Sequence, residues 1–404
     1  MQTVADIHSF NTFAVARAIH AAGVCTRREL VEATGLSFST VATICGKLIA
    51  NQVLVEVGRA APTVGRPTTK LALNPSHGVF LGVDIAETYV HVETLDLALD
   101  TVSHTRRETQ PSVNSPEEVL LEVNAAIAEE QGRHPGHRLL GVGVAAPGQV
   151  DQAGGLSLFA PNWGWHDVPL IDMLAPSVSA PLYLDNPLKS LVLAEIWANP
   201  ERCSQDFAVV NLGTGVGAAF AIEGKVHRGS TNSAGEWGHT VLFGDGRACR
   251  CGSRGCVEAY VGAPGIIQTL READPGSHLL RGDDQTATIN ALRAAAAAKN
   301  DPTALEVIAL TGHYLGMALA SIVNFLNPSI IVVTGWVARQ LGPVLIDQAQ
   351  PDINSHSLAV PLGAVRIEQP GANGNAVCRG VAAQAFEGYL KSLPDTAAEV
   401  AKRP

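Results

Sequence analysis

The chain has 404 residues, of which 46% are hydrophobic and 16% charged; this composition argues against intrinsic disorder and leaves room for two or three folded domains. We find no apolar run of membrane-spanning length and no secretion signal, so a cytoplasmic protein without a membrane partner is expected. The net charge of -10 argues against a chain that coats nucleic acid over its whole surface. Residues 1–75, in contrast, carry seven Lys and Arg and four acidic residues, which indicates a separate, mildly basic module.

Three helices are predicted in the first fifty residues. Apolar side chains recur at helical spacing as far as Gly23, and a second helix, capped by Thr26, ends at Gly35. A third helix runs from Ser37 to Ala50. Two short helices joined by a tight turn that contains glycine are typical of a helix-turn-helix.

A small β-wing is predicted after the third helix. The pattern indicates a strand over Val53–Val57, a loop with Gly, Pro and Arg over Gly58–Pro67, and a second strand over Lys70–Leu73. Asn74-Pro75 then marks a domain boundary. We therefore expect residues 1–75 to form a winged helix-turn-helix.

From about residue 78 the sequence alternates between apolar strand-like runs and helical patterns, which predicts an α/β architecture. A second block of the same kind begins near Phe207. Because both blocks begin with a strand and a turn that contains Gly or Thr, we expect an internal duplication. The expected domains are residues 76–196 as a first lobe, 197–393 as a second lobe and 394–404 as a tail, with a C-terminal helix that can return to the first lobe.

The strongest local motif combines His239 with three cysteines, Cys249, Cys251 and Cys256. Imidazole and thiolate ligands suit tetrahedral zinc, and the small residues between the cysteines allow the loop to fold around an ion. Four protein ligands close the coordination sphere, so such a zinc would be structural rather than hydrolytic. Three partly buried cysteines beside a core histidine are compatible with the same spacing.

Two further patterns are compatible with a ligand. The glycines of Leu212–Gly217 allow a tight turn and the close approach of backbone N–H groups to an anion, although a hairpin without a ligand explains them equally well. This turn is not a Walker A loop, because the Lys-Ser/Thr ending is absent. A sugar needs several fixed donors and acceptors beside an apolar face. The polar residues suited to that role are Asn162, Asn186, Glu236, His239 and Glu258.

Gly235–His239 and Cys249–Glu258 together resemble the ROK family (repressors, open reading frames, kinases), through its GExGH motif and its CxCGxxGCxE signature. Leu212–Gly217 is similar to the second phosphate-binding turn of that family. The segment Leu30–Leu54, followed by Gly65–Pro67, resembles the winged helix-turn-helix of the repressor branch, which ROK kinases usually lack.

The resemblance covers roughly residues 10–390. It implies a bilobal fold of the actin/hexokinase (ribonuclease H-like) type, in which a duplicated α/β domain follows the head. It also implies a structural zinc and a sugar-binding cleft. The implied zinc ligands are His239, Cys249, Cys251 and Cys256, and the implied sugar ligands are Asn162, Asn186, Glu236, His239 and Glu258.

Three departures from the kinase pattern of the family predict that phosphoryl transfer is lost. Pro187 stands where the kinases have a catalytic Asp after the sugar-binding Asn186, and proline cannot accept a proton. The first phosphate-binding turn, Asp84–Thr88, has side chains and a negative charge in place of two glycines. Trp336 occupies the second position of a Gly-Gly motif on the nucleotide side. We therefore expect no catalytic residue and no enzyme activity.

The expected function is a sugar-responsive DNA-binding regulator of carbohydrate metabolism genes, with repression as the default. Its partners would be operator DNA and a sugar or sugar-phosphate effector, and it would act as a homodimer or tetramer. The expected DNA contacts are Ser37, Ser39, Thr40, Thr43, Lys47, Arg59 and Arg66. Two alternatives remain open: a ROK-type ATP-dependent sugar kinase with an added DNA-binding head, and a constitutive DNA-binding protein with a vestigial cleft.

Overall fold

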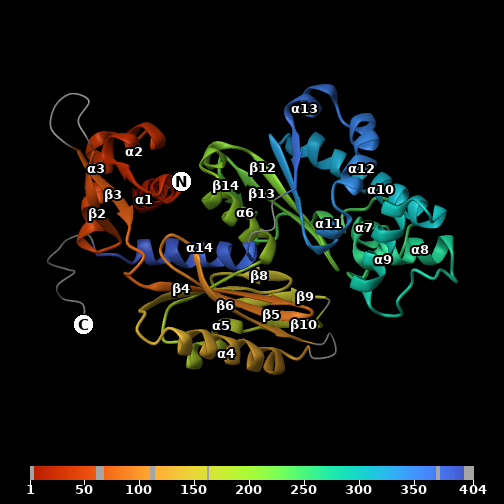
Figure 1. The fold of residues 1–404 in the computed structure, drawn as a ribbon, viewed down its shortest axis with the longest axis horizontal. Helices are drawn as coiled ribbons and strands as arrows, with labels where there is room; N and C mark the ends of the chain where they lie inside the picture. The colour runs from red at the N-terminus through yellow and green to blue at the C-terminus, as the bar shows by residue number, and fades with distance from the viewer. Residues whose placement is uncertain (1–3, 61–67, 110–113, 162, 370–373, 395–404) are drawn as a thin grey trace. The chain divides into compact units, whose positions relative to one another are not determined.

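The computed structural model describes residues 4–60, 68–109, 114–161, 163–369 and 374–394 (Figure 1). Two expected site residues, Asn162 and Arg66, lie outside these ranges. The chain divides into two compact units, unit one with residues 1–203 and 373–404, and unit two with residues 204–372.

Unit one begins with a head of three helices and a small antiparallel sheet. The elements of the head are α1 (Val4–Ala22), β1 (Cys25–Thr26), α2 (Arg27–Thr34), α3 (Phe38–Ala50), β2 (Leu54–Ala60) and β3 (Thr68–Leu73). The strands pair in the order β1-β3-β2. This arrangement is a winged helix-turn-helix, as the sequence predicts.

The ends of the two short helices have the caps that the sequence predicts. Thr26 N donates to Glu29 Oε2 at 2.7 Å and Glu29 N donates to Thr26 Oγ1 at 3.3 Å, which is a capping box. Gly35 ends α2 with a φ of 68°, a conformation that glycine adopts without steric cost. Ser37 Oγ then accepts from Thr40 N at 3.1 Å and begins α3.

The rest of unit one is an α/β lobe. Its elements are β4 (Val79–Ala86), β5 (Tyr89–Leu95), β6 (Thr101–Glu108), α4 (Pro116–Arg133), β7 (Leu139–Ala145), β8 (Gln149–Asp151), β9 (Leu156–Ala160), β10 (Trp165–Val168), α5 (Leu170–Leu174), η1 (Ala175–Ser177), β11 (Leu182–Asp185), α6 (Pro187–Ala198), η2 (Pro200–Ser204) and α14 (Ala376–Lys391). The main sheet has the order β11-β7-β4-β5-β6. Helix α4 packs on β5 and β6, whereas α14 packs on β7 and β4 and against α6 (Figure 1).

Unit two repeats this plan. Its elements are β12 (Phe207–Leu212), β13 (Val216–Ile222), β14 (Lys225–His227), η3 (Trp237–His239), α7 (Glu258–Val261), α8 (Ala263–Ala273), α9 (Gln285–Ala298), α10 (Pro302–Leu326), β15 (Ile330–Thr334), α11 (Trp336–Leu341), α12 (Pro343–His356), α13 (Ala359–Ala364) and β16 (Arg366–Glu368). Its sheet has the order β14-β13-β12-β15-β16. In both sheets an antiparallel run of three strands is followed by two strands parallel to the first one. The predicted α/β duplication is confirmed.

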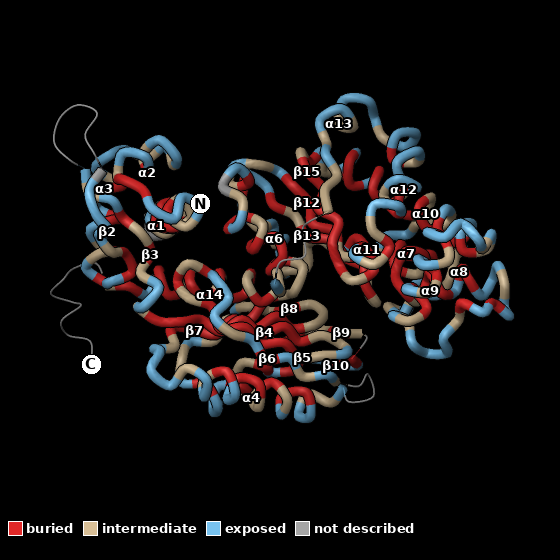
Figure 2. Tube along the Cα trace, viewed as in Figure 1, coloured by how far each residue is buried: buried red, intermediate tan, exposed pale blue. Residues whose placement is uncertain are grey.

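The inner strands of both sheets are buried, and each of them pairs with a parallel neighbour. Strand β15 is buried along its whole length, and β4 along all but its last residue (Figure 2). Strands covered on both faces require continuous apolar runs, which is why the sequence shows such runs here rather than an alternation of apolar and polar residues.

Helix α10 corrects the expectation that no apolar run has membrane-spanning length. Among the described residues, this 25-residue helix is long and apolar enough to cross a membrane, and 61% of its most apolar window is buried. Its side chains belong to the core of unit two, where α10 packs against α12, α8 and α9. Its hydrophobicity is therefore that of a core helix.

Helix α14 belongs to unit one, the lobe to which the sequence analysis allowed a C-terminal helix to return, and the two units divide after Cys203 and again near residue 373. Two glycines explain the close packing of this helix. A Cβ atom at Gly143 of β7 would overlap with the carbonyl oxygen of Val381, and one at Gly380 would overlap with that of Ser190 in α6. The backbone of α14 thus rests directly on the sheet and on α6.

Glu130 of α4 is a buried carboxylate that ties this helix to the outer strands. Its oxygens accept hydrogen bonds from Thr94 Oγ1 at 2.8 Å, Ser103 Oγ at 2.5 Å and Thr105 Oγ1 at 2.7 Å. Arg133 Nη1 adds an ion pair at 2.7 Å. Burial favours a higher pKa, but the three hydroxyls and the guanidinium outweigh it, so the pKa of Glu130 is lowered.

We expect Glu130→Gln to destabilise the protein by about 2–3 kcal/mol at pH 7, because an ionised acceptor is lost. Since the folded-state pKa lies below the unfolded one, this stabilisation is present above about pH 4.3 and is lost as the pH falls through the folded-state pKa. Urea unfolding at pH 7 and at pH 4 gives the free energy of unfolding of wild type and variant. The difference between the two free energies should be smaller at pH 4 than at pH 7. Glu129→Gln, at a position whose side chain is 40% exposed, is the matched control. An equal difference at both pH values would contradict the prediction.

Candidate metal centre and ligand site

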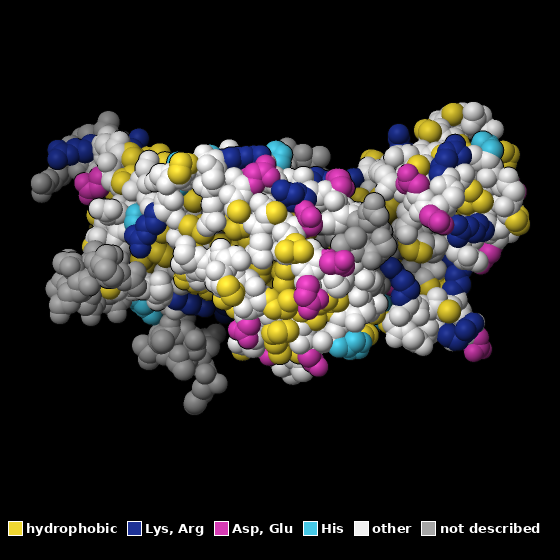
Figure 3. Space-filling view, turned by 90° about the horizontal axis from the view of Figure 1, so that it is seen from below, with side chains coloured by type: hydrophobic (Ala, Val, Ile, Leu, Met, Phe, Trp, Pro, Cys, Tyr) yellow, Lys and Arg dark blue, Asp and Glu magenta, His cyan; other side chains and the backbone are white. Residues whose placement is uncertain are grey.

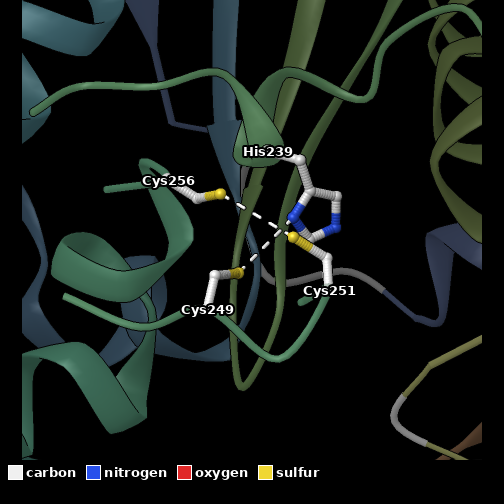
Figure 4. Close-up of side chains that lie close together, drawn as sticks. All are labelled: His239, Cys249, Cys251 and Cys256. Atoms are coloured by element: carbon white, nitrogen blue, oxygen red, sulfur yellow. Dashed lines mark hydrogen bonds between the residues drawn. The ribbon is translucent and has the colours of Figure 1, made fainter. Parts of the chain in front are cut away.

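The four expected metal ligands meet at one point of unit two (Figure 4). His239 Nδ1 lies 3.7 Å from Cys249 Sγ, and Cys251 Sγ lies 3.8 Å from Cys256 Sγ. All four ligand atoms lie within 4.8 Å of one another. A tetrahedral zinc with Zn–S bonds of about 2.3 Å requires sulfur atoms about 3.8 Å apart. The spacing of the donor atoms therefore fits a tetrahedral metal ion.

Local backbone structure holds the cysteine loop in place. Cys249 N donates to Ser253 O at 2.9 Å, and Gly252 N donates to Cys249 O at 3.1 Å. Gly255 has a φ of 74°, and a Cβ atom there would overlap with the carbonyl oxygen of Phe243. Only glycine allows this close approach, and it places Cys256 on the buried side of the loop.

The thiols need a cation to become metal-binding thiolates. Burial raises the pKa of Cys249 to about 12 and also raises the pKa of Cys256. A bound metal ion reverses this preference, because it deprotonates a coordinating thiol outright. The donor set, three thiols and an imidazole, is one that zinc prefers.

Glu258 connects the cysteine loop to the glycine-rich turn. Its side chain is buried, and Oε2 accepts from Val216 N at 2.9 Å. Its other oxygen lies 3.8 Å from Cys249 Sγ and 3.7 Å from Arg250 Nη2. Glu258 and His239 thus flank Cys249, so the structure brings two of the expected sugar ligands together.

Glu236 and Asn186 lie in different units. Glu236 is exposed and precedes η3, whose last residue is His239. Asn186 is the N-cap of α6 in unit one: its Oδ1 accepts from Leu188 N at 2.8 Å and its Nδ2 donates to Gly148 O at 2.7 Å. Sequence reasoning identified Asn186 as a sugar contact and did not foresee this capping role.

The glycine-rich turn Leu212–Gly217 has neighbours on several sides. A Cβ atom at Gly213 would lie 3.3 Å from Cδ1 and Nε1 of Trp336. Arg250 Nη2 donates to Thr214 O at 3.1 Å, and Val216 N is used by Glu258. The indole of Trp336 therefore lies against the face of the turn that Gly213 leaves open.

The turn expected to match the first phosphate-binding turn of the family begins at a buried carboxylate. Asp84 is buried, and its Oδ2 accepts from Tyr89 Oη at 3.0 Å and from Asn375 Nδ2 at 2.9 Å. Burial, opposed by these hydrogen bonds, raises the pKa of Asp84. Asn375 is the N-cap of α14, so this carboxylate holds the start of the returning helix.

The expected DNA contacts lie on α3 and β2, except Arg66, which falls outside the described residues. Ser37, Ser39, Thr43 and Arg59 are exposed, and Thr40 and Lys47 are half-buried. Ser37 Oγ lies 2.9 Å from Ser39 Oγ and 2.8 Å from Thr40 Oγ1. On the face shown in Figure 3, acidic and basic side chains of the described residues are interspersed, as expected for a protein that does not coat nucleic acid.

Sequence reasoning missed a contact between the head and the α/β lobe. Arg17 of α1 pairs with Glu387 of α14 at 2.5 Å and lies over the ring of Trp197, 5.7 Å from its centroid. Trp197 Nε1 donates to Glu387 Oε1 at 3.2 Å. Burial raises the pKa of the thiol of Cys203, the last residue before unit two, and the positive charge of Arg17 opposes that rise. No local pattern in the sequence indicates these pairings.

A winged helix-turn-helix joined to a duplicated α/β fold, with one histidine and three cysteines clustered in its second unit, defines the class of this protein. Residues 80–385 match the ROK family, and the chain belongs to that family. A solved structure of a ROK family transcriptional regulator, a homolog of the E. coli MLC protein, superposes with a TM-score of 0.78 at 24% identity, over 96% of this chain and 98% of that one. The fold is therefore of the actin/hexokinase type, as the resemblance implies.

Two curated relatives represent the two branches of the family. The xylose repressor of Caldicellulosiruptor bescii is 24% identical over 380 residues, which cover 93% of this chain and 94% of the relative. The glucokinase of Halalkalibacterium halodurans is 30% identical over 289 residues, which cover 69% of this chain and 86% of the relative. The similarity to the repressor thus extends into residues 1–75.

Proposed function

We propose that this chain is a sugar-responsive, DNA-binding transcriptional repressor of carbohydrate metabolism genes, without kinase activity. The head and the repressor relatives support DNA binding, and the observation that carries the loss of kinase activity is Pro187, the first residue of α6 directly after Asn186. If the ROK resemblance holds residue by residue, Pro187 stands where the kinases of the family have a catalytic Asp. A side chain without a proton acceptor cannot act as the base for a sugar hydroxyl.

The neighbouring carboxylate does not replace the missing base. Asp185 is 1% exposed, and its Oδ1 accepts from Asn186 N at 2.8 Å. Trp336, packed against Gly213, fills space on the nucleotide side. Asp84 is already committed to Tyr89 and Asn375. These contacts support the loss of phosphoryl transfer, which depends on positioned phosphates and a base.

The retained polar residues would form the effector site. We assign sugar binding to Asn162, Asn186, Glu236, His239 and Glu258, and zinc binding to His239, Cys249, Cys251 and Cys256. Zinc supplies the fixed positive charge that keeps three thiolates together and holds the cysteine loop. With Nδ1 of His239 on the metal side, its Nε2 is left for a sugar hydroxyl or a neighbouring partner.

Helix α6 offers a route from the effector site to the head. Its N-cap is Asn186, and it ends just after Trp197, whose ring lies 5.6 Å from the His20 ring of α1. Trp197 and Arg17 share Glu387 of α14. We call the set Arg17, Trp197 and Glu387 the head contact. A shift of α6 on sugar binding would move the head contact. This movement would change the equilibrium between two arrangements of the head and thereby its affinity for DNA.

The DNA-binding surface would be the outer side of α3 and the wing. Recognition helices present their N-terminal residues to the major groove. The exposed hydroxyl residues Ser39 and Thr43 fit that role, and Arg59 on β2 and Arg66 fit phosphate contact. A homodimer would place two heads on two half-sites.

Glu236→Gln is expected to weaken sugar binding by about ten- to a hundredfold, because a hydrogen bond to a charged acceptor contributes about 1.5–3 kcal/mol. A thermal-shift screen of monosaccharides, amino sugars and their phosphates identifies the effector, and calorimetry then gives its Kd. Glu306→Gln, another exposed acid of unit two, should leave the Kd unchanged. ATP consumption measured with the same sugars should equal the background without protein. Sugar-dependent ATP turnover would instead support the kinase alternative, and the absence of binding to any sugar would overturn the sensor.

A further inference from the structure

Phe38, the first residue of α3, has an exposed side chain that helical periodicity assigns to the core. It precedes Val41, Cys45 and Leu48 at spacings of three, seven and ten, and all three are buried. Phe38 itself is 60% exposed. Covering this ring with an apolar group of a partner would be favourable, because burial of apolar surface stabilises a complex.

The other exposed residues of α3 have small side chains or, at Gly46, none. The exposed residues Ser39, Thr43, Gly46 and Ala50 recur at spacings of four, seven and eleven and form one stripe. Such side chains let the helix axis approach a surface closely. Phe38 is the largest exposed side chain of α3, and it lies in the first turn, where recognition helices meet base edges.

The hydroxyls beside Phe38 are partly committed to each other. Ser37 Oγ accepts from Thr40 N at 3.1 Å and lies 2.9 Å from Ser39 Oγ. Small hydroxyls in any case discriminate weakly among bases. The first turn of α3 therefore offers more apolar surface than strong hydrogen-bonding groups for the recognition of sequence.

We propose that Phe38 packs against the C5-methyl group of a thymine in the major groove and gives the operator a thymine preference at that position. The inference rests on the proposed DNA-binding function. The thymine methyl is the apolar group that the major groove presents. Nucleic acid is favoured over a protein partner because the head is basic: the Arg28 side chain on α2 is 85% exposed, and residues 1–75 carry seven Lys and Arg against four acids.

The test begins with a selection from random duplex DNA by the full-length, effector-free protein. Each thymine of the selected sequence is then replaced by deoxyuridine, which removes the methyl group and keeps the hydrogen-bonding edge. For wild type, one or two thymines per half-site should show a Kd about fourfold weaker after replacement, as expected for one buried methyl group. In Phe38→Ala the ratio of the two Kd values should fall to about one.

Two further variants test whether the effect depends on the apolar side chain of Phe38. Phe38→Leu retains an apolar side chain and should keep part of the deoxyuridine penalty. Phe325→Ala, at a residue of α10 that is 95% exposed, should keep all of it. If the deoxyuridine penalty is unchanged in Phe38→Ala, the assignment of Phe38 is wrong, but the proposed function still stands. The same holds if Phe38→Ala keeps the penalty and differs from wild type only in its oligomeric mass, measured by ultracentrifugation. Failure of the full chain to select any sequence would overturn the proposed function as well.

Discussion

Replacing Cys256 by Ser is expected to abolish zinc binding and to lower the melting temperature by roughly 8–16 °C. Cys256 is fully buried, and its Sγ lies 3.8 Å from Cys251 Sγ, so the substitution removes a ligand from the core side of the loop. Structural zinc contributes much of the folding free energy of small metal-binding loops. A loss of about 4 kcal/mol corresponds to this shift for a unit of about 150–250 residues.

Elemental analysis of the purified protein and differential scanning calorimetry measure these effects. Wild type should contain close to one zinc per chain, and Cys256→Ser almost none. Cys203→Ser is the matched control, because Cys203 is also a free cysteine but lies outside the cluster. The zinc assignment would be wrong if Cys256→Ser kept a full zinc content, or if a chelator removed the metal from wild type without changing its melting temperature.

Trp197→Ala is the second substitution with a large expected effect, a destabilisation of about 3–5 kcal/mol. Trp197 is 1% exposed, and its ring lies 5.3 Å from Phe386 and 5.6 Å from His20. Truncation would leave a cavity between α6, α14 and α1 and would remove the donor to Glu387. Chemical denaturation followed by circular dichroism gives the free energy of unfolding of the two proteins.

The variant Trp197→Phe tests the role of Trp197 in transmitting the effector signal separately from its contribution to the free energy of unfolding. It keeps an aromatic ring in the core but removes the N–H donor, so the cost should fall to about 1–2 kcal/mol. If the head contact transmits the effector signal, the ratio of DNA affinities with and without sugar should approach one in this variant. Trp165→Phe also loses an indole hydrogen bond, to Asn114 O, away from the head, and should keep the wild-type ratio. A wild-type ratio in Trp197→Phe would show that the signal takes another route.

The metal cluster and the head could be predicted from the sequence, because the residues that indicate them lie close together in the chain. Cys249, Cys251 and Cys256 lie within eight residues of one another on one loop, so their spacing predicts a shared ligand site, and in the structure they cluster with His239. The caps at Thr26 and Ser37 depend on residues three positions away.

The remaining site residues were harder, because a residue type does not reveal its partners. Asn186 is a polar residue in the segment expected to contact sugar, yet both ends of its amide are engaged in the N-cap of α6 and in a bond to Gly148. Phe38 has the periodicity of a core residue and is nevertheless exposed at the end of its helix. Both residues lie at the N-terminus of a helix. Their environment there depends on the end of the helix and not on the repeating pattern along it.

The amino-acid order was sufficient for the winged head, the duplicated α/β plan and the cysteine loop, because capping, strand and helix periodicity and ligand spacing act over a few residues. Folding in three dimensions was needed to show how closely α14 packs at Gly143, that Arg17 meets Glu387 at a separation of 370 residues, and that Trp336 lies against Gly213. Contacts of this kind depend on which surfaces pack together once both sheets have formed, and short-range patterns carry no information about that choice.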